Sequence, residues 1–271
     1  MRRRTAVLFG MGLILAAGIG WGNTVVVSTH AVFAEFAATV GGDAVEVVSI
    51  IPSGFCPAQY DLRPSDIQAV SRADLILYSG FEPWMEDLLR SVGGDALSIR
   101  LTGTWNTPDA AVSKIEAIAA ALCEVVPEEA TRFAANAGAA RAAMEALGAS
   151  LLARAEPLDV VGVPVIAMEW QEGFLAWLGF PIEATYAPPA GLTMRDLVAL
   201  RDVGLETGVA LVIDNLQSGV DFGAKLAREI GAVHVVLSNF PGAMPDTGSV
   251  TALLQRNADA LFSAIEPVPS E

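Results

Sequence analysis

Residues 127–156 read PEEATRFAANAGAARAAMEALGASLLARAE, and this stretch decides the fold. It is rich in alanine, leucine, arginine and glutamate, with Pro127 at its start and Pro157 just beyond its end. Proline is tolerated in the first turn of a helix and stops a helix at its far end. About 29 residues at about 1.5 Å each give a helix of about 43 Å, long enough to cross a whole molecule. The alternative is two shorter helices broken near Gly138 or Gly148, because interior glycine weakens a helix.

Short apolar runs rich in β-branched residues lie on both sides of this helix, with polar or amphipathic stretches between them. Such alternation predicts βα units with parallel strands, which are apolar throughout when helices cover both faces of a sheet. The predicted fold is α/β, with two lobes, each a small parallel sheet flanked by helices, bridged by one long α-helix. The runs are residues 24–29, 45–51, 74–80 and 97–101 before the helix, and 163–168, 182–187, 208–214 and 233–237 after it; an amphipathic stretch, 251–265, closes the chain.

Four segments are expected along the chain. Residues 1–22 form a signal peptide or N-terminal anchor, 23–126 the N-terminal lobe, 127–156 the linking helix and 157–271 the C-terminal lobe. Each lobe then has about 100 residues, which is within the usual range for a domain.

The N-terminal segment has the order of an export signal. Three arginines at residues 2–4 precede an apolar run over residues 6–21, which contains small residues towards its end. This order is typical of a signal peptide, and the alternative is an uncleaved membrane anchor, because the run approaches the roughly 17–20 residues of a spanning helix. The first cysteine after the run is Cys56, so the sequence does not favour a lipid-anchored N-terminus. Both alternatives place the protein in the periplasm or on the outer face of the cytoplasmic membrane.

The composition limits the partners. The formal net charge is −15, and loss of the three N-terminal arginines with a signal would make it −18 (−15 minus 3). We therefore expect no nucleic-acid partner, and long-range attraction gives weak support for a cationic one. Cys56 and Cys123 are the two cysteines, too few for a disulfide framework, although one bridge between them stays open.

Residues 54–89 read GFCPAQYDLRPSDIQAVSRADLILYSGFEPWMEDLL and form the most specific stretch of the chain. This stretch resembles the corresponding segment of the metal-ion solute-binding proteins of ABC transporters, and the similarity extends over most of residues 24–265. The shared positions, in order and spacing, are Pro57, Tyr60, Asp61, Pro64, Ser65, Asp66, Ala73, Asp74, Leu75, Glu82, Pro83 and Trp84.

The resemblance implies an exported receptor of an ABC importer. Such a receptor captures a divalent metal ion of the zinc or manganese class between its lobes and delivers it to a membrane permease driven by an ATPase. The metal is then the transported ligand; no organic cofactor is expected, and we expect a monomer. A long rigid helix also implies that the lobes close little around the ligand.

The ligand positions of this family are not preserved. The family coordinates its ion with histidines and carboxylates, but the positions of its three histidines hold Ala58, Gly103 and Glu169 here. The final aspartate aligns with Ser238 or Asn239.

Substitute donors are present, and a transition-metal site needs about four. Four of them also have a simpler explanation: a buried thiol for the cysteine, a loop or helix-capping role for the histidine, a surface or loop role for the glutamine and stabilisation of a helix N-terminus for the glutamate. The candidate metal ligands are His30, Cys56, Gln59, Glu169 and Asn239.

A second group of residues falls near the expected cleft. Tryptophan supplies apolar area and one N–H donor, so a polar and aromatic cleft could hold a ligand larger than an ion. A receptor for a metal chelate or small organic solute, and a surface adhesion or sensing protein of the same fold, are the alternatives. These further cleft candidates are Asp61, Trp105, Trp170, Gln171 and Ser238.

An enzyme is the least favoured class. His30 and His234 are the two histidines of the sequence, and it contains no GxSxG, P-loop or GxGxxG motif. We therefore predict that the protein is not an enzyme.

Overall fold

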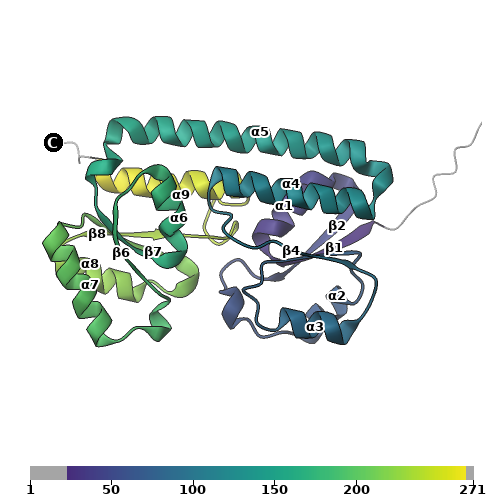
Figure 1. Ribbon diagram of the computed structural model, residues 1–271, viewed down its shortest axis with the longest axis horizontal. Coiled ribbons are helices and arrows are strands. Elements are labelled where there is room, and N and C mark those ends of the chain that lie inside the picture. Colours follow the sequence, from purple (N-terminus) through teal and green to yellow (C-terminus); the bar gives the residue numbers. More distant parts are fainter. Residues whose placement is uncertain (1–22, 267–271) are drawn as a thin grey trace, which may run out of the picture.

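The computed structural model describes residues 23–266, which form two α/β lobes lying side by side beneath one long helix (Figure 1). The signal peptide or anchor predicted for residues 1–22 lies outside the described residues. Within residues 23–266, no helix combines the length and apolar character needed to cross a membrane.

The N-terminal lobe is built on a four-stranded parallel sheet with the order β2-β1-β3-β4. The central strand β1 is apolar, and its Val26 pairs with Val47 on one side and Leu75 on the other. The strands are β1 (Thr24–His30), β2 (Val45–Ile51), β3 (Leu75–Tyr78) and β4 (Leu97–Arg100), and the helices are α1 (Ala31–Gly41), α2 (Pro64–Val70), α3 (Met85–Val92) and α4 (Pro108–Val125).

The C-terminal lobe repeats this topology. Its sheet is also four-stranded and parallel, and the order β6-β5-β7-β8 corresponds strand for strand to that of the first lobe. The predicted strands and the α/β class are confirmed in both lobes. The strands are β5 (Val165–Met168), β6 (Ile182–Tyr186), β7 (Leu211–Asn215) and β8 (Val233–Leu237), and the helices are α6 (Glu172–Leu178), α7 (Met194–Thr207), α8 (Asp221–Ile230) and α9 (Val250–Ile265).

The long helix α5 (Ala130–Ala155) is continuous, so the alternative of two shorter helices is not found. A 3-10 turn at Pro127–Glu129 leads into it and another at Glu156–Leu158 follows it. Figure 1 shows α5 running above both lobes, with α4 and α9 beneath it.

The two glycines of α5 lie in different surroundings. Gly148 is buried against α4, where an added Cβ would lie 3.1 Å from the Pro108 side chain. Gly138 is exposed, and no atom lies within 4 Å of the position of an added Cβ. Close packing therefore favours glycine at position 148 but not at position 138.

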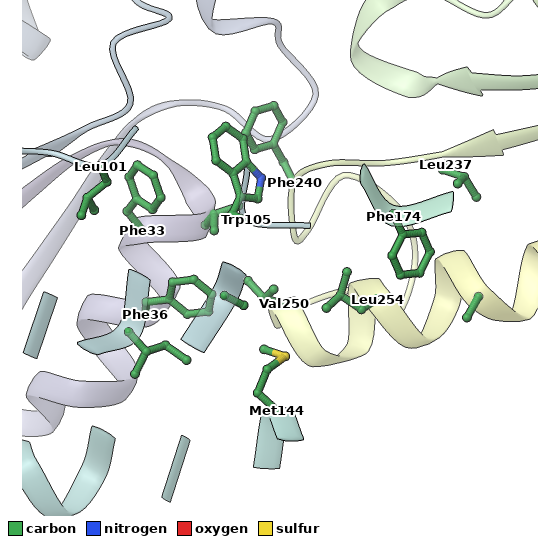
Figure 2. Packing of buried hydrophobic residues seen from close by; sticks show 14 of the residues in the cluster. Phe33, Phe36, Leu101, Trp105, Met144, Phe174, Leu237, Phe240, Val250 and Leu254 are labelled. Carbon is green, nitrogen blue, oxygen red and sulfur yellow. The ribbon is translucent and has the colours of Figure 1, made fainter. Parts of the chain in front are cut away.

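One hydrophobic core is shared by both lobes and α5 (Figure 2). Phe33 and Trp105 of the N-terminal lobe belong to the same buried cluster as Met144 of α5 and Phe174 and Leu254 of the C-terminal lobe. Movement of one lobe away from the other would expose part of this cluster to water, which is unfavourable. The core therefore resists wide separation of the lobes. Each sheet also has a smaller core on its other face, under α2 and α3 in one lobe and under α7 and α8 in the other.

Candidate functional site: the cleft between the lobes

The carboxyl ends of strands from both sheets meet at the cleft. Phe81 follows β3, Trp105 follows β4, Trp170 follows β5 and Asn239 follows β8, and these four residues line the same two hollows. Loops at the carboxyl ends of parallel strands are where open α/β sheets commonly bind ligands. The repeated topology thus places the binding edge of each lobe opposite that of the other.

The first hollow, here called the inner cavity, has a volume of about 70 Å³. Its walls are aromatic and carboxamide side chains, together with the thiol of Cys56, and no carboxylate, ammonium, guanidinium or imidazole group lines it. The lining residues are Cys56, Pro57, Ala58, Phe81, Trp105, Trp170, Asn215, Gln217, Ser218, Asn239 and Phe240.

The second hollow, here called the outer groove, is larger, at about 430 Å³. It shares Phe81, Trp105, Trp170 and Asn239 with the inner cavity and adds two carboxylates. The residues that line only the outer groove are Gly103, Thr104, Asn106, Glu169, Glu172, Gly173 and Ala176.

Three aromatic rings form a corner between the two hollows. Phe81 lies edge-on to Trp170, with ring centroids 5.2 Å apart and an interplanar angle of 71°. It is also edge-on to Trp105, at 6.1 Å and 70°. Phe81 and Trp170 are 41% and 38% exposed, whereas Trp105 is 7% exposed, so the first two rings can move and the third is fixed by packing.

Three hydrogen bonds join the lobes across the cleft. The Trp105 indole Nε1 donates to the Asn239 carbonyl at 3.0 Å, and Asn106 Nδ2 donates to the Trp170 carbonyl at 3.0 Å. Gln217 Nε2 donates to the Ser53 carbonyl, also at 3.0 Å. All three acceptors are backbone carbonyls, which fixes the spacing of the cleft walls. All four residues of the first two bonds line one or both hollows, so these bonds join the walls of the site directly.

Carboxamides form a buried network behind the cavity wall. Gln171 Nε2 donates to Asn215 Oδ1 at 3.1 Å and to Asn239 Oδ1 at 3.0 Å, and the backbone N–H of Asn239 donates to Gln217 Oε1 at 3.3 Å. Gln217 also donates to the hydroxyl of Ser238 at 2.8 Å. Gln171 is fully buried, and its Oε1 has no hydrogen-bond partner among the described residues. This network fixes Asn239 and Asn215 in the cavity wall.

His30 lies in a packed aromatic cluster. It is 1% exposed, and its ring centroid lies 4.3 Å from that of Phe33, 4.8 Å from Trp105 and 5.2 Å from Phe240. Neither ring nitrogen has a hydrogen-bond partner in the described part of the chain, and the side chain does not cap α1, which begins at the next residue. Burial lowers the pKa of His30 to about 4, although the charge of Glu82 acts to raise it. The imidazole is therefore neutral at physiological pH.

Glu82 is the buried carboxylate of this edge. Burial acts to raise its pKa, but hydrogen bonds, among them that of the Thr29 hydroxyl, outweigh burial and lower the pKa. The backbone N–H of Gly80 donates to the carboxylate at 2.7 Å, and the backbone N–H and hydroxyl of Ser79 donate at 3.2 and 3.0 Å. Glu82 thus holds the loop after β3 and positions Phe81 at the cleft.

The structure brings together some of the candidates chosen from sequence. Cys56, Trp105, Trp170 and Asn239 line the inner cavity, and Glu169 joins the last three around the outer groove. Gln171 and Ser238 lie behind the wall in the carboxamide network. Gln59 and Asp61 are exposed and line neither hollow, and His30 touches the cavity wall from behind without lining it.

A metal centre of the usual composition is not preformed. Within residues 23–266, no three side chains of histidine, cysteine, aspartate or glutamate come together as a group that could hold a metal ion. Of the five candidate metal ligands, Cys56 and Asn239 line one hollow, and Asn239 and Glu169 line the other. Their role as ligands stays a prediction.

Sequence reasoning missed several residues of the site: Phe81, Asn106, Asn215, Gln217 and Phe240. A usable signal existed, because Asn215 is the last residue of a strand, and Phe81, Gln217 and Phe240 each lie within five residues after the end of one. The carboxyl-edge rule would have selected them.

A family comparison agrees with this architecture. The sequence model of the family described as "Zinc-uptake complex component A periplasmic" (ZnuA) matches residues 26–264 of this chain. The chain belongs to this family. The matched range begins in β1 and ends in α9, so the ZnuA family covers both lobes, the linking helix and the cleft.

Curated relatives match over shorter stretches. The metal ABC transporter substrate-binding lipoprotein FimA of Streptococcus parasanguinis is 38% identical over 80 residues, which are 28% of this chain and 25% of that protein. The manganese ABC transporter substrate-binding lipoprotein PsaA of Streptococcus pneumoniae is 40% identical over 55 residues, 20% of this chain and 18% of the relative. The chain thus spans about a quarter or less of the length of these relatives.

Solved structures show the same fold over nearly the whole chain. The periplasmic zinc-binding protein TroA of Treponema pallidum has a TM-score of 0.81 at 17% identity, covering 91% of this chain and 100% of TroA. The protein FpvC of P. aeruginosa, solved with Ni²⁺, has a TM-score of 0.79 at 21% identity, covering 92% and 99%. The two-lobed fold with its long helix is therefore shared with TroA and FpvC.

Proposed function

We propose that this chain is the exported solute-binding protein of an ABC importer, binding its ligand in the cleft between the lobes and delivering it to a membrane permease driven by an ATPase. The observation that carries the proposal is the family match over residues 26–264, on a fold whose two binding edges face one another across the cleft. The names of FimA and PsaA, both ABC transporter substrate-binding lipoproteins, support this function.

Location and assembly follow from the same proposal. The family description contains the word periplasmic, and the segment of residues 1–22 has the order of a signal peptide or anchor. We expect residues 23–126 and 157–271 to act as the lobes of a monomer on either side of the linking helix. The N-terminal sequence and the mass of the protein recovered from its host will show whether the signal is removed, and light scattering will give its oligomeric state.

Catalysis is not part of the proposal. Both histidines of the sequence are committed to structure: His30 is packed between aromatic rings, and His234 Nε2 lies 2.7 Å from the buried carboxylate of Asp214. A nucleophile–histidine pair therefore has no candidate at the cleft among the described residues.

A divalent metal ion of the zinc or manganese class is the first candidate ligand. It is supported by the metals named for relatives and neighbours, manganese for PsaA and zinc for TroA. In this chain the Cys56 thiol and the Asn239 carboxamide line the inner cavity, and the Glu169 carboxylate lines the adjoining groove. Binding an ion would require these donors to converge with water or with His30, since about four are needed.

A metal chelate or a small organic solute is the second candidate, and the chemistry of the cavity favours it. Most polar and aromatic groups of the inner cavity wall are aromatic rings and carboxamides; one thiol, that of Cys56, lines it, and no carboxylate or imidazole does. Aromatic and carboxamide groups bind ligands with apolar surface and hydrogen-bonding edges. Aromatic rings offer a bare divalent ion no donor, and carboxamides are weaker ligands for zinc than thiolate or imidazole.

The metal content of the full chain, purified without chelators, separates the two candidates. Mass spectrometry of the metals should find one ion per chain if the first candidate holds, and Cys56→Ser should release it. Cys123→Ser is the matched control, because Cys123 lies in the core between α4 and α5, away from the cleft. A wild-type protein without a stoichiometric ion excludes the first candidate.

A further inference from the structure

The outer groove has an unusual combination of walls. Phe81, Trp105 and Trp170 supply three aromatic rings, and Glu169 and Glu172 supply two carboxylates. No lysine or arginine is among its lining residues. The Lys114 ammonium lies 3.9 Å from the position of an added Cβ at Gly103 and donates to the Thr102 carbonyl at 2.5 Å, so one positive charge lies beside the groove at this residue. The lining of the groove is thus aromatic, and its two carboxylates outnumber the one ammonium group nearby.

This combination disfavours two classes of ligand in the outer groove. An anion would face Glu169 and Glu172 without a positive partner in the groove, which costs energy at short range. A bare divalent ion would find two carboxylates, one of them on the exposed side chain of Glu172, and no third charged or imidazole donor. Cations with an apolar envelope remain, because they need faces of aromatic rings more than a closed shell of donors.

The orientation of the rings suits such a cation. Phe81 is inclined at 71° to Trp170 and at 70° to Trp105, so the rings form a corner that presents faces and edges from different directions. An ammonium group that carries methyl groups binds over aromatic faces, where the negative face of the ring quadrupole attracts the charge. The volume of about 430 Å³ is within the range of small-molecule sites.

We propose that the outer groove binds an organic cation, a methylated ammonium compound, with its charged group held by Phe81, Trp105 and Trp170 and attracted by Glu169 and Glu172. The inference rests on the proposed function and deepens its second candidate by naming the class of solute. The carboxamides of Asn106 and Asn239, which also line the groove, are available to hydrogen-bond the rest of the solute.

Isothermal titration of the full chain with choline, and in parallel with 3,3-dimethylbutan-1-ol, tests the role of the charge. The two probes have nearly the same shape, and only choline carries a positive charge. We expect saturable binding of one choline per chain, at least about fivefold tighter than binding of the alcohol, which corresponds to a cation–π contribution of about 1 kcal/mol. Equal binding of the two probes, or no binding of choline by the folded protein, would overturn the proposal.

Variants locate the binding in the groove. Trp170→Leu removes an exposed ring and should weaken choline binding about fivefold or more, and Glu169→Gln should weaken it less, by a factor that shrinks as salt is added. Glu206→Gln, on the exposed surface of α7, is the matched control for charge and should bind choline like the wild type. Undiminished binding by Trp170→Leu would contradict the assignment.

A blocked groove provides a test that is independent of ring chemistry. Ala176 is exposed on α6 and lines the groove, so Ala176→Leu should occupy it and reduce choline binding about tenfold, while leucine remains a good helix former. Ala153→Leu, on the exposed side of α5, is the control for added apolar surface. Equal binding by both variants would place the choline elsewhere.

The outcomes separate this inference from the proposed function. If the chain stimulates its importer when loaded with Zn²⁺ or Mn²⁺ and binds no choline, the inference fails and the receptor function stands. If the chain binds choline in the groove but engages no ABC permease, the inference stands and the proposed function fails.

Discussion

At the scale of single residues, a polar side chain buried without a hydrogen-bond partner determines the chemistry behind the cleft wall. The His30 imidazole has no hydrogen bond among the described residues and is surrounded by Phe33, Trp105 and Phe240. In this environment the charged form is unfavourable, so the residue acts as an aromatic packing group between the lobes. The residue affects the stability of the fold as a charged group only when it takes up a proton.

Protonation of His30 should destabilise the protein in acid. Its pKa falls from 6.5 to about 4 on folding, so between these pH values the unfolded chain takes up a proton that the folded chain does not. The contribution of neutral His30 to the free energy of unfolding is therefore fully present above pH 6.5. It is lost as the pH falls towards 4, and the loss is on the order of 3 kcal/mol. Chemical denaturation of metal-free protein at a series of pH values should show a smaller loss of stability for His30→Leu than for the wild type. Parallel pH dependences of the two proteins would show that His30 does not titrate in this way.

At the scale of elements, the long helix combines a site of close packing and a site of free surface in one sequence. Gly148 lies against Pro108 of α4, and Gly138 faces open space. Relative to alanine, glycine therefore favours stability at position 148 and lowers it at position 138.

Alanine should separate these effects. Gly138→Ala should raise the free energy of unfolding by about 0.5–1 kcal/mol, because alanine favours the helix and no neighbour obstructs its Cβ. Gly148→Ala should lose this gain and lower stability, because its Cβ would lie 3.1 Å from two carbons of Pro108. Thermal or chemical unfolding of the two variants provides the comparison. Equal stabilisation by both substitutions would show that α4 and α5 pack less tightly.

The elements of the fold could be predicted from the sequence more completely than the site. The strands and the long helix could be predicted because their signals are local: apolar β-branched runs, an alanine-rich stretch, and proline at either end. The site could be predicted only in part. Trp105, Trp170 and Asn239 follow strand ends, but the burial of His30 and the exposure of Gln59 depend on contacts from distant segments. The hydrogen bond from Gln217 to Ser53 spans 164 residues and has no local signal.

At the scale of the whole molecule, the shared core and the linking helix limit how the cleft can work. Trp105 belongs to the common core and also donates a hydrogen bond to the Asn239 carbonyl across the cleft. Wide opening would break this bond and expose the core. We therefore expect capture to depend on local movement, and Phe81 and Trp170 are exposed aromatic residues of the cleft wall.

Small-angle scattering measures this property. We expect no resolvable change in the radius of gyration when ligand binds, in contrast to the compaction produced by hinge closure. Tryptophan fluorescence should change on the same titration, because Trp105 and Trp170 line both hollows. A large compaction would show that the lobes are hinged despite their common core.

The most direct test of the account is the ATPase activity of the chain's own importer, reconstituted in proteoliposomes. The chain is purified from its host without chelators, so that it keeps the ligand it carries there, and is added to the vesicles. We predict that the wild-type chain stimulates ATP hydrolysis and that Ala176→Leu, which blocks the outer groove, stimulates it far less, while Ala153→Leu behaves like the wild type. An ATPase rate that is unchanged by the wild-type chain, or equal stimulation by Ala176→Leu, would contradict the account of a receptor that presents its ligand from this cleft.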